Sequence, residues 1–557
     1  MKSTDMGGLP MKLNVLALIV SLMTAVVAQA DGQRVLVVMK DAKAFKSAHM
    51  AYQSKGSYAL KGFNVAGAPT GFDKIDAQVE DSLGNINTLV ISAKSESEIV
   101  KLRNNPAVAY VEKEIFHEAP RPVRGWLSSK KRSSKLPKTN TPWGIMAVKA
   151  PQAWKASSQG EGARVLVLDT GMDTQHPALA PNFEKGQDFT GNSSGSDITD
   201  DIGHGTHVAG TVAAVLDKDG FTGVAPKAKI LAGRVCAANG CSNVAIARGI
   251  NWGIQEKVDV ITMSLGGPWS TPAERIAVSN ADKAGITVIA ASGNDGSNKV
   301  SYPAALSSVI AVGAVDSNLN KADFSQYGPE LAIVAPGVAV VSAVPLGSGR
   351  ESEVVLGGDS QLGKVKSTTF QGAREVLQPE KNQLVHAGLG KAEDFAKAKV
   401  SGKYALISRG DITFAEKVQH AIKAGAAGVV IYNNAPGLIQ GALTDDGSTL
   451  PVPVFMIEQT AGQEVVAQLG EGKVVEATLQ TVATDYSAFD GTSMATPHVA
   501  GVAALMKAAN KSLTGAQVKQ ILKSTAQQLN GPNTNNELGA GLVDAEAAVQ
   551  AAMSVAN

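Results

Sequence analysis

Five continuous apolar runs, with helical stretches between them, constrain the fold of this 557-residue chain more than any other feature. The runs are the segments 165–168, 229–235, 258–263, 286–291 and 309–315. Helical patterns lie between them, for example at 243–255 and 273–284. Continuous rather than alternating apolar strands indicate a parallel sheet that is covered on both faces. The sequence therefore predicts an α/β fold with a doubly wound, mostly parallel sheet.

A serine near the C-terminus lies at the start of a predicted helix. Ser493 is part of the segment GTSMATPHVAG (491–501), which leads directly into an apolar helical run. Unpaired N–H groups and the positive dipole end at such a position favour developing negative charge. A serine hydroxyl is a weak nucleophile until a base removes its proton. His204 in DIGHGTHVAG (201–210) is the candidate base, and Asp169, after the first apolar run, is the candidate acid that orients it.

Each of these residues also has an ordinary structural interpretation. A serine after Gly-Thr often caps a helix, and an aspartate at a strand end often caps the next helix. His204 and His207 have a spacing that suits a metal pair, but no third ligand and no glutamate of a His-Glu-x-x-His motif accompanies them. Separate structural roles do not explain why the three motifs occur together.

In chain order, the motifs of Asp169, His204 and Ser493 resemble those of the subtilisin-like serine proteases. The resemblance covers about residues 142–345 and 486–552. It implies a catalytic triad with Ser493 as nucleophile, His204 as general base and Asp169 as the orienting acid. It also implies that Asn294, directly after an apolar strand, donates to the oxyanion together with the Ser493 N–H.

The same resemblance implies where substrate binds. The substrate-binding residues that it implies are Ser264, Leu265, Gly266, Ala291, Ser292 and Gly293. Ser301 is expected near the base of the main specificity pocket. Because none of these residues is charged, we expect a bulky neutral side chain before the scissile bond.

The two cysteines, Cys236 and Cys241, flank an Asn-Gly turn. In an exported chain this spacing suits a small hairpin closed by a disulfide. Two free thiols and half of a metal site are the alternatives, and pairing is not readable from sequence alone. We favour the disulfide.

The N-terminus has the pattern of a signal peptide, residues 1–30. A basic Met11-Lys12 precedes the apolar run 13–27, which ends in Ala28-Gln29-Ala30. A transmembrane anchor is the alternative, but the run is short for one and ends in a cleavage motif. We therefore expect a secreted protein with no membrane partner after the signal is removed.

Residues 31–118 read as a small α/β unit. Its segment 105–112 resembles the inhibitory propeptide of subtilisin-like zymogens, and a permanently attached N-terminal domain is the alternative. Residues 119–140 are rich in lysine and arginine and suit a cleavable tether. The resemblance thus predicts that the propeptide inhibits its own enzyme.

The catalytic domain is predicted in two parts, 141–347 and 485–557, which are separated by far more than an ordinary loop. The intervening residues 348–484 contain a strand–helix–strand pattern between 402 and 434 that resembles the protease-associated domain. The fold class is therefore a subtilisin-like α/β body with an inserted β-rich domain and a small α/β propeptide.

No cofactor is expected for catalysis, but a structural calcium ion is an open question. Asp217 matches a side-chain ligand of the family's calcium loop, whereas Ala178 and Thr139 stand where other ligands are expected. The net charge of +1 predicts no nucleic-acid partner. We expect a monomer whose partners are protein or peptide substrates and its own propeptide.

These patterns predict a secreted, self-processing serine endopeptidase. A peptide ligase or cyclase that uses the same acyl-enzyme is one alternative. An inactive binding protein, whose insert supplies the function, is another. The complete triad argues against the inactive protein, because a scaffold has no use for all three residues together.

Overall fold

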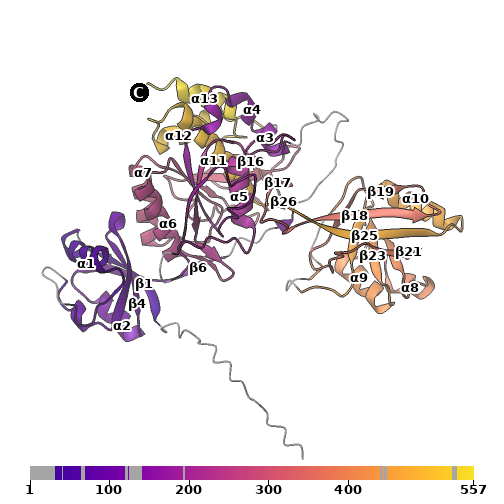
Figure 1. Cartoon of the computed structure of the whole chain (residues 1–557), viewed down its shortest axis with the longest axis horizontal. Coiled ribbons are helices and arrows are strands. Elements are labelled where there is room, and N and C mark those ends of the chain that lie inside the picture. The colour runs from indigo at the N-terminus through magenta and orange to yellow at the C-terminus, as the bar shows by residue number, and fades with distance from the viewer. Residues whose placement is uncertain are drawn as a thin grey trace, which may run out of the picture.

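The computed structural model describes residues 32–40, 42–63, 69–118, 123–124, 141–191, 195–439, 443–444, 448–529 and 536–556. The predicted signal peptide lies outside the described residues, as does the predicted linker 119–140 apart from residues 123–124. The described residues form an N-terminal unit (32–118), a body and an insert, and the body lies between the other two (Figure 1). None of the described helices has the length and apolar character needed to cross a membrane.

A sheet of seven parallel strands forms the centre of the body, in the order β16-β15-β14-β13-β8-β10-β9. The strands are β8 (Arg164–Asp169), β9 (Phe183–Asp188), β10 (Lys229–Arg234), β13 (Val260–Met263), β14 (Thr287–Ala291), β15 (Ile310–Val315) and β16 (Leu331–Pro336). This confirms the predicted α/β fold. The strands β9 and β16, at the two edges, were not predicted.

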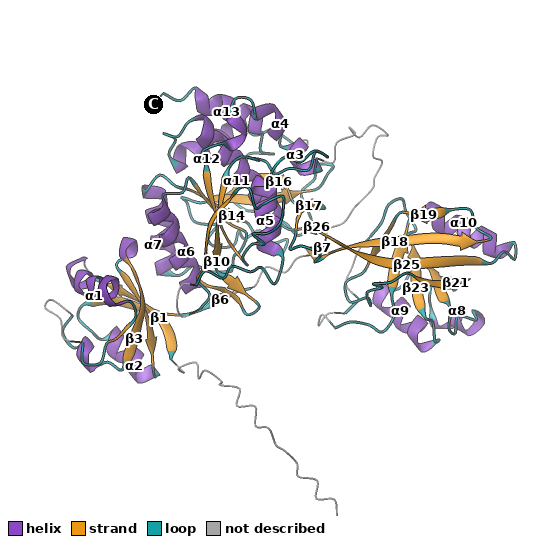
Figure 2. Ribbon diagram, viewed as in Figure 1, coloured by secondary structure: helices purple, strands orange, loops and turns teal. Residues whose placement is uncertain are grey.

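Helices cover both faces of this sheet (Figure 2). Alternate residues of β8 point to opposite cores: Val165 and Val167 pack with α5 and α11, whereas Leu166 and Leu168 pack with α6 and α7. The body helices are α3 (Trp143–Ala147), α4 (Ala150–Ala153), α5 (His204–Ala213), α6 (Asn243–Glu256), α7 (Pro272–Lys283), α11 (Thr492–Ala509), α12 (Gly515–Thr525) and α13 (Ala545–Met553). Burial on both faces explains why the central strands are continuously apolar.

The N-terminal unit is an antiparallel sheet in the order β2-β3-β4-β1-β5 with two helices on it. Its elements are β1 (Gln33–Met39), α1 (Ala42–Lys55), β2 (Tyr58–Ala59), β3 (Ala77–Leu83), β4 (Thr88–Ala93), α2 (Glu96–Arg103) and β5 (Val108–Lys113). Phe45, Phe72 and Ile99 belong to a buried apolar core that contains residues of this unit alone.

The insert leaves the body on a two-stranded ribbon, β18 (Gly349–Gly358) paired with β25 (Val475–Thr484) along ten residues of each strand (Figure 1). The two ribbon strands are part of an eight-stranded sheet in the order β19-β18-β25-β21-β22-β23-β24-β20. Its other elements are β19 (Gly363–Val365), β20 (Ser367–Thr369), β21 (Glu380–His386), α8 (Ala392–Lys397), β22 (Tyr404–Ser408), α9 (Phe414–Lys423), β23 (Gly428–Tyr432), β24 (Val454–Ile457) and α10 (Gln459–Gly470).

Two small sheets join the other parts of the chain to the body. In the first, β6 (Phe116–His117) pairs with the hairpin β11 (Cys236–Ala237) and β12 (Gly240–Ser242). The second has the order β17 (Val340–Ala343), β26 (Tyr486–Asp490), β7 (Val123–Arg124). Both sheets therefore contain a strand from the region around the predicted propeptide–linker boundary.

Candidate active site

Asp169 and His204 are joined by a buried hydrogen bond. Asp169 is the last residue of β8, and His204 is the first residue of α5. The His204 Nδ1 lies 2.7 Å from the Asp169 Oδ1, and the two residues are 2 % and 0 % exposed. The same oxygen accepts the Thr170 N–H at 2.8 Å. This arrangement holds the imidazole with its Nδ1 toward the carboxylate and its Nε2 available on the other side.

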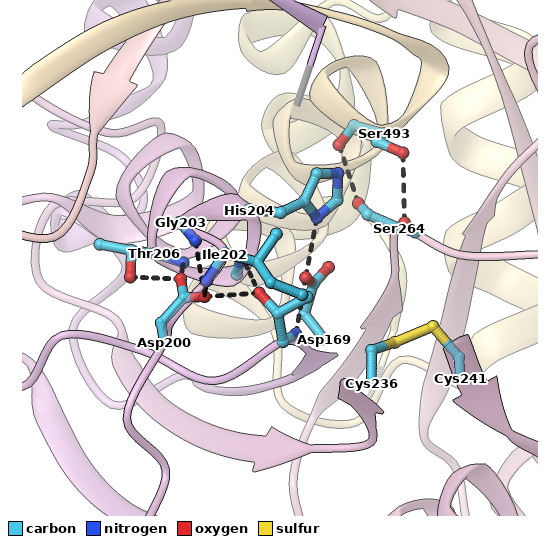
Figure 3. Close-up of polar contacts among 12 residues, drawn as sticks. Asp169, Asp200, Ile202, Gly203, His204, Thr206, Cys236, Cys241, Ser264 and Ser493 are labelled. Atoms are coloured by element: carbon cyan, nitrogen blue, oxygen red, sulfur yellow. Dashed lines mark hydrogen bonds and ion pairs between the residues drawn. A yellow bond between two sulfur atoms is a disulfide. The ribbon is translucent and has the colours of Figure 1, made fainter. Parts of the chain in front are cut away.

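Ser493 lies in the first turn of α11, and Figure 3 shows the His204 ring between Asp169 and Ser493. The Ser493 Oγ donates to the Ser264 carbonyl at 3.1 Å, and the Ser264 Oγ donates to the Ser493 carbonyl at 2.8 Å. Asp169 is at the carboxyl end of β8 and Ser264 directly follows that of β13, the edge where α/β sheets of this kind place their chemistry. The structure thus brings the three predicted triad residues together.

A further carboxylate, Asp200, connects the loop of Asp169 to the start of α5. Its Oδ1 accepts the Thr170 hydroxyl at 2.7 Å and the N–H groups of Gly203 at 2.8 Å and Ile202 at 3.2 Å. Its Oδ2 accepts the N–H and the hydroxyl of Thr206, at 2.8 and 2.6 Å (Figure 3). The sequence analysis missed Asp200, although it stands only four residues before His204.

Asn294 follows β14 and contacts the first turn of α11. Its Oδ1 accepts both the N–H and the hydroxyl of Thr492, each at 2.9 Å. Because the oxygen of the amide is engaged in this way, its NH₂ end is the donor that remains for the cleft. Asn294 and Ser493 line the same cavity. The arrangement can stabilise an oxyanion beside Ser493.

This cavity, the cleft, has a volume of about 660 Å³. Of the predicted substrate-binding residues, those that line it are Ser264, Leu265, Gly266, Ala291 and Gly293. Ser292 is 0 % exposed, and its hydroxyl donates to the Gln326 carbonyl at 2.9 Å. Ser301 lines the cleft together with Gln326, whose Oε1 lies 3.4 Å from the Ser301 Oγ. The sequence analysis did not identify Gln326.

The sequence profile of the subtilase family matches residues 160–376 and 459–541, and that of the PA domain matches residues 377–465. The chain belongs to the subtilase family. The match therefore agrees with a catalytic body that is interrupted by a protease-associated insert.

Individual subtilases are similar to this chain over most of their own length. The chain is 37% identical to the major intracellular serine protease of Bacillus subtilis over 270 residues, which are 46% of this chain and 81% of that protein. It is 38% identical to the M-protease of Shouchella clausii over 305 residues, 54% of this chain and 77% of that protein.

A solved subtilase structure is also similar. The psychrophilic subtilisin-like protease Apa1 of Pseudoalteromonas sp. AS-11 matches with a TM-score of 0.57 at 30% identity, over 75% of this chain and 99% of that chain. The protein is thus a subtilisin-like serine protease by family.

The end of the N-terminal unit of this subtilase lies in the cleft. Residues of β6 pair antiparallel with β12, His117 opposite Cys241 and Phe116 opposite Ser242. Glu118, the next residue, lines the cleft. The hairpin that receives β6 is closed by a disulfide between Cys236 and Cys241, which confirms that prediction.

Asp217 and His207, the two residues considered as metal ligands, have local structural partners. The Asp217 Oδ1 accepts the N–H groups of Asp219 at 2.8 Å and Phe221 at 2.9 Å, so it closes its own loop. Burial lowers the pKa of His207 to about 3, and its Nε2 lies 2.9 Å from the Val340 carbonyl. Within the described ranges, no three histidine, cysteine or acidic side chains gather as metal ligands would. Asp217 and His207 thus each have a local structural partner and belong to no cluster of three such side chains within the described ranges.

Proposed function

We propose that this subtilase is a secreted serine endopeptidase that is made as a self-processing zymogen. The observation that carries the catalytic part is the 2.7 Å contact between His204 Nδ1 and Asp169 Oδ1, with Ser493 beside the same ring (Figure 3). In this proposal Ser493 is the nucleophile, His204 the general base and acid, and Asp169 the group that orients His204.

The reaction proceeds through an acyl-enzyme. His204 removes the hydroxyl proton of Ser493 while Oγ bonds to the peptide carbonyl carbon, and the oxyanion is held by the Asn294 NH₂ and the Ser493 N–H. His204 then gives the proton to the leaving amine as the C–N bond breaks. Water then attacks the acyl carbon while His204 takes a proton from it. His204 afterwards gives this proton to the Ser493 Oγ as the bond between Oγ and the acyl carbon breaks.

The lining of the cleft supports a preference for a bulky neutral side chain before the scissile bond. Its lining includes Gly266 and Gly293 and the uncharged residues Ser301 and Gln326. Lys299 and Asp295 are the charged lining residues that the cleft has besides Glu118, and both are exposed.

The position of β6 supports self-inhibition by residues 31–118. An extended strand that pairs with β12 and ends in the cleft occupies the place of the acyl side of a substrate. We expect the maturation cleavage to fall between Phe116 and Thr141. The apolar leader that ends in Ala28-Gln29-Ala30 supports secretion.

Replacement of the proposed nucleophile tests the catalytic assignment. Ser493→Ala should abolish hydrolysis of casein and leave a longer precursor, because no other group in the cleft replaces the activated hydroxyl. Ser401→Ala, at an exposed serine of the insert, is the control and should behave as the parent chain. Hydrolysis of casein by purified Ser493→Ala at a rate comparable with that of the parent would refute the mechanism.

A further inference from the structure

Strand β26 lies directly before the first turn of α11 and has a partly occupied edge. One side of β26 pairs with β17, from Val340 opposite Phe489 to Ala343 opposite Tyr486. On the other side, the described residues of β7 pair with β26 at two positions, Arg124 opposite Phe489 and Val123 opposite Asp490. Such an edge presents N–H and C=O groups that can bind a further extended strand.

The chain itself shows the direction in which an extended segment crosses this site. Glu118 lines the cleft, and residues 123–124, a few positions later, lie on β26. Because β7 and β26 are antiparallel, a strand that continues past Arg124 in the same register would lie opposite Ala488 and then Ser487. A substrate threaded in this direction places the residues after its scissile bond along β26, toward the insert.

A cavity of about 420 Å³ lies where this path leads. It is lined by Ile202 and Gly203, directly before His204, and by Ser487 and Phe489 of β26. The opposite wall belongs to the insert and its ribbon, with side chains that include Ser348, Thr369, Gln371, Arg374, Glu375 and Thr449. The cavity is therefore shared between the body and the insert.

The charges on the insert side of this cavity are already paired. Arg374 makes two hydrogen bonds to the Glu380 carboxylate, at 2.8 and 2.7 Å. Glu375 accepts the Arg350 Nε–H at 2.9 Å. The hydroxyl and amide groups of Ser348 and Gln371 belong to exposed residues. This chemistry suits an extended polypeptide that is bound through its main chain and through polar side chains.

We propose that the insert completes an extended subsite for the amine-side half of the substrate, with β26 pairing its main chain and residues 369–375, at the end of β20 and after it, contacting side chains in the cavity. The inference rests on the proposed endopeptidase function and assigns the insert a place in it. The substrates that gain from this subsite are unfolded or flexible protein segments with several residues after the scissile bond. Peptides that end soon after that bond do not reach the cavity.

Quenched fluorescent peptides test this subsite when they share one acyl-side sequence and carry two, four or six residues after the scissile bond. For the parent enzyme, kcat/KM should rise about tenfold from two to six residues, the effect expected of a few added main-chain hydrogen bonds. Gln371→Trp fills the cavity and should reduce this ratio to below about twofold. Gln361→Trp, at an exposed glutamine of the insert outside the cavity, should keep the parent ratio.

The ratio of the two kcat/KM values does not depend on the fraction of active enzyme, so partial misfolding does not imitate the result. If Gln371→Trp does not fold, Ser348→Trp fills the same cavity from the position directly before β18 and should give the same loss. An unchanged ratio in the cavity variants, or no length dependence in the parent, would overturn the subsite. Failure of the proposed function is separate, since it would appear as hydrolysis of the two-residue peptide by Ser493→Ala.

Discussion

The N-terminal unit and the body satisfy their polar groups in different ways. In the body, the buried carboxylate of Asp200 accepts hydrogen bonds from Thr170, Ile202, Gly203 and Thr206, which all belong to the body. The N-terminal unit has an apolar core of its own, but several of its acidic groups find their partners across the interface with the body.

Three acidic residues of the N-terminal unit make these contacts. Asp81 lies 2.6 Å from the Arg248 Nε, Glu112 accepts the Ala273 N–H at 2.8 Å, and Glu114 accepts the Ser242 hydroxyl. The last two contacts lie at the N-termini of α7 and α6, where unpaired N–H groups and the helix dipole favour a carboxylate. The N-terminal unit therefore has an apolar core of its own, while several of its surface carboxylates depend on the body for partners, which is consistent with the proposed role as a propeptide.

The largest expected effect comes from removal of a charge at this interface. Arg248 is 1 % exposed, so Asp81→Ala would remove the carboxylate that lies 2.6 Å from a buried cation. We expect the unfolding free energy of the full chain, in a Ser493→Ala background, to fall by about 3 to 5 kcal/mol in a urea titration. The matched control is Asp73→Ala, at an exposed residue of the same unit. Equal losses of unfolding free energy in both variants would show that the pair of Asp81 and Arg248 stabilises the chain no more than an exposed aspartate does.

A second test uses the pH dependence of the interface. Burial raises the pKa of Glu274, next to the Glu112 contact, to about 7. Its carboxyl thus keeps its proton to a higher pH in the folded chain than in the unfolded chain. The unfolding free energy therefore falls as pH rises from about 4.5 to about 7 and then levels off. Between pH 5 and pH 8, Glu274 should cost the parent on the order of 3 kcal/mol of unfolding free energy. Glu274→Gln should not show this loss.

Glu161→Gln, at an exposed glutamate, is the control. Its unfolding free energy should change with pH as steeply as that of the parent. Burial also raises the pKa of Glu112, so part of the slope should remain in Glu274→Gln. A slope identical to that of the parent would mean that Glu274 does not change its protonation on folding.

Within the body, Asp200→Asn tests whether the internal network positions His204. The amide replaces an oxygen by a donor that faces other donors, so the Asp169 loop and the start of α5 should shift relative to each other. We expect kcat to fall about 10- to 100-fold with KM within about twofold, because a positioning effect acts on the transition state. Asp201→Asn, at its exposed neighbour, should leave both constants unchanged, and an equal loss there would contradict the assignment.

The smallest expected effect concerns calcium. Because the Asp217 carboxylate is engaged within its own loop, EDTA should lower the melting temperature by less than about 2 °C. The measurement is a thermal scan with EDTA and one with added calcium. A shift of more than about 10 °C would reveal a strong calcium site that includes backbone carbonyl groups.

Much of the body could be predicted because its signals are local. Strands such as β14 and β15 are buried on both faces, so their apolar runs are visible without knowledge of their neighbours. The edge strand β9 has the polar sequence FEKGQD and gives no such run. The apolar run LAIVAP of β16 was a usable signal that the sequence analysis did not assign.

The candidate site likewise contains residues that could be predicted from the sequence and residues that could not. Asp169, His204 and Ser493 were predictable because each lies at the end of a strand or the start of a helix, inside a short motif. The roles of Asp200 and Gln326 were not predictable, since Asp200 also meets Thr170 and Gln326 meets Ser301, and both of these partners come from other segments of the chain. No local pattern states that Asp200 meets Thr170, which lies 30 residues earlier.

The sequence by itself determined the alternation of strands and helices, the three catalytic motifs and their order, and the presence of an insert, because burial periodicity and helix starts are properties of short segments. The tertiary structure alone decided that β6 enters the cleft, that β7 lies on β26 and that the insert shares a cavity with the body. These contacts join segments that are far apart in the chain. Their energy depends on strand order and register, which no single segment encodes.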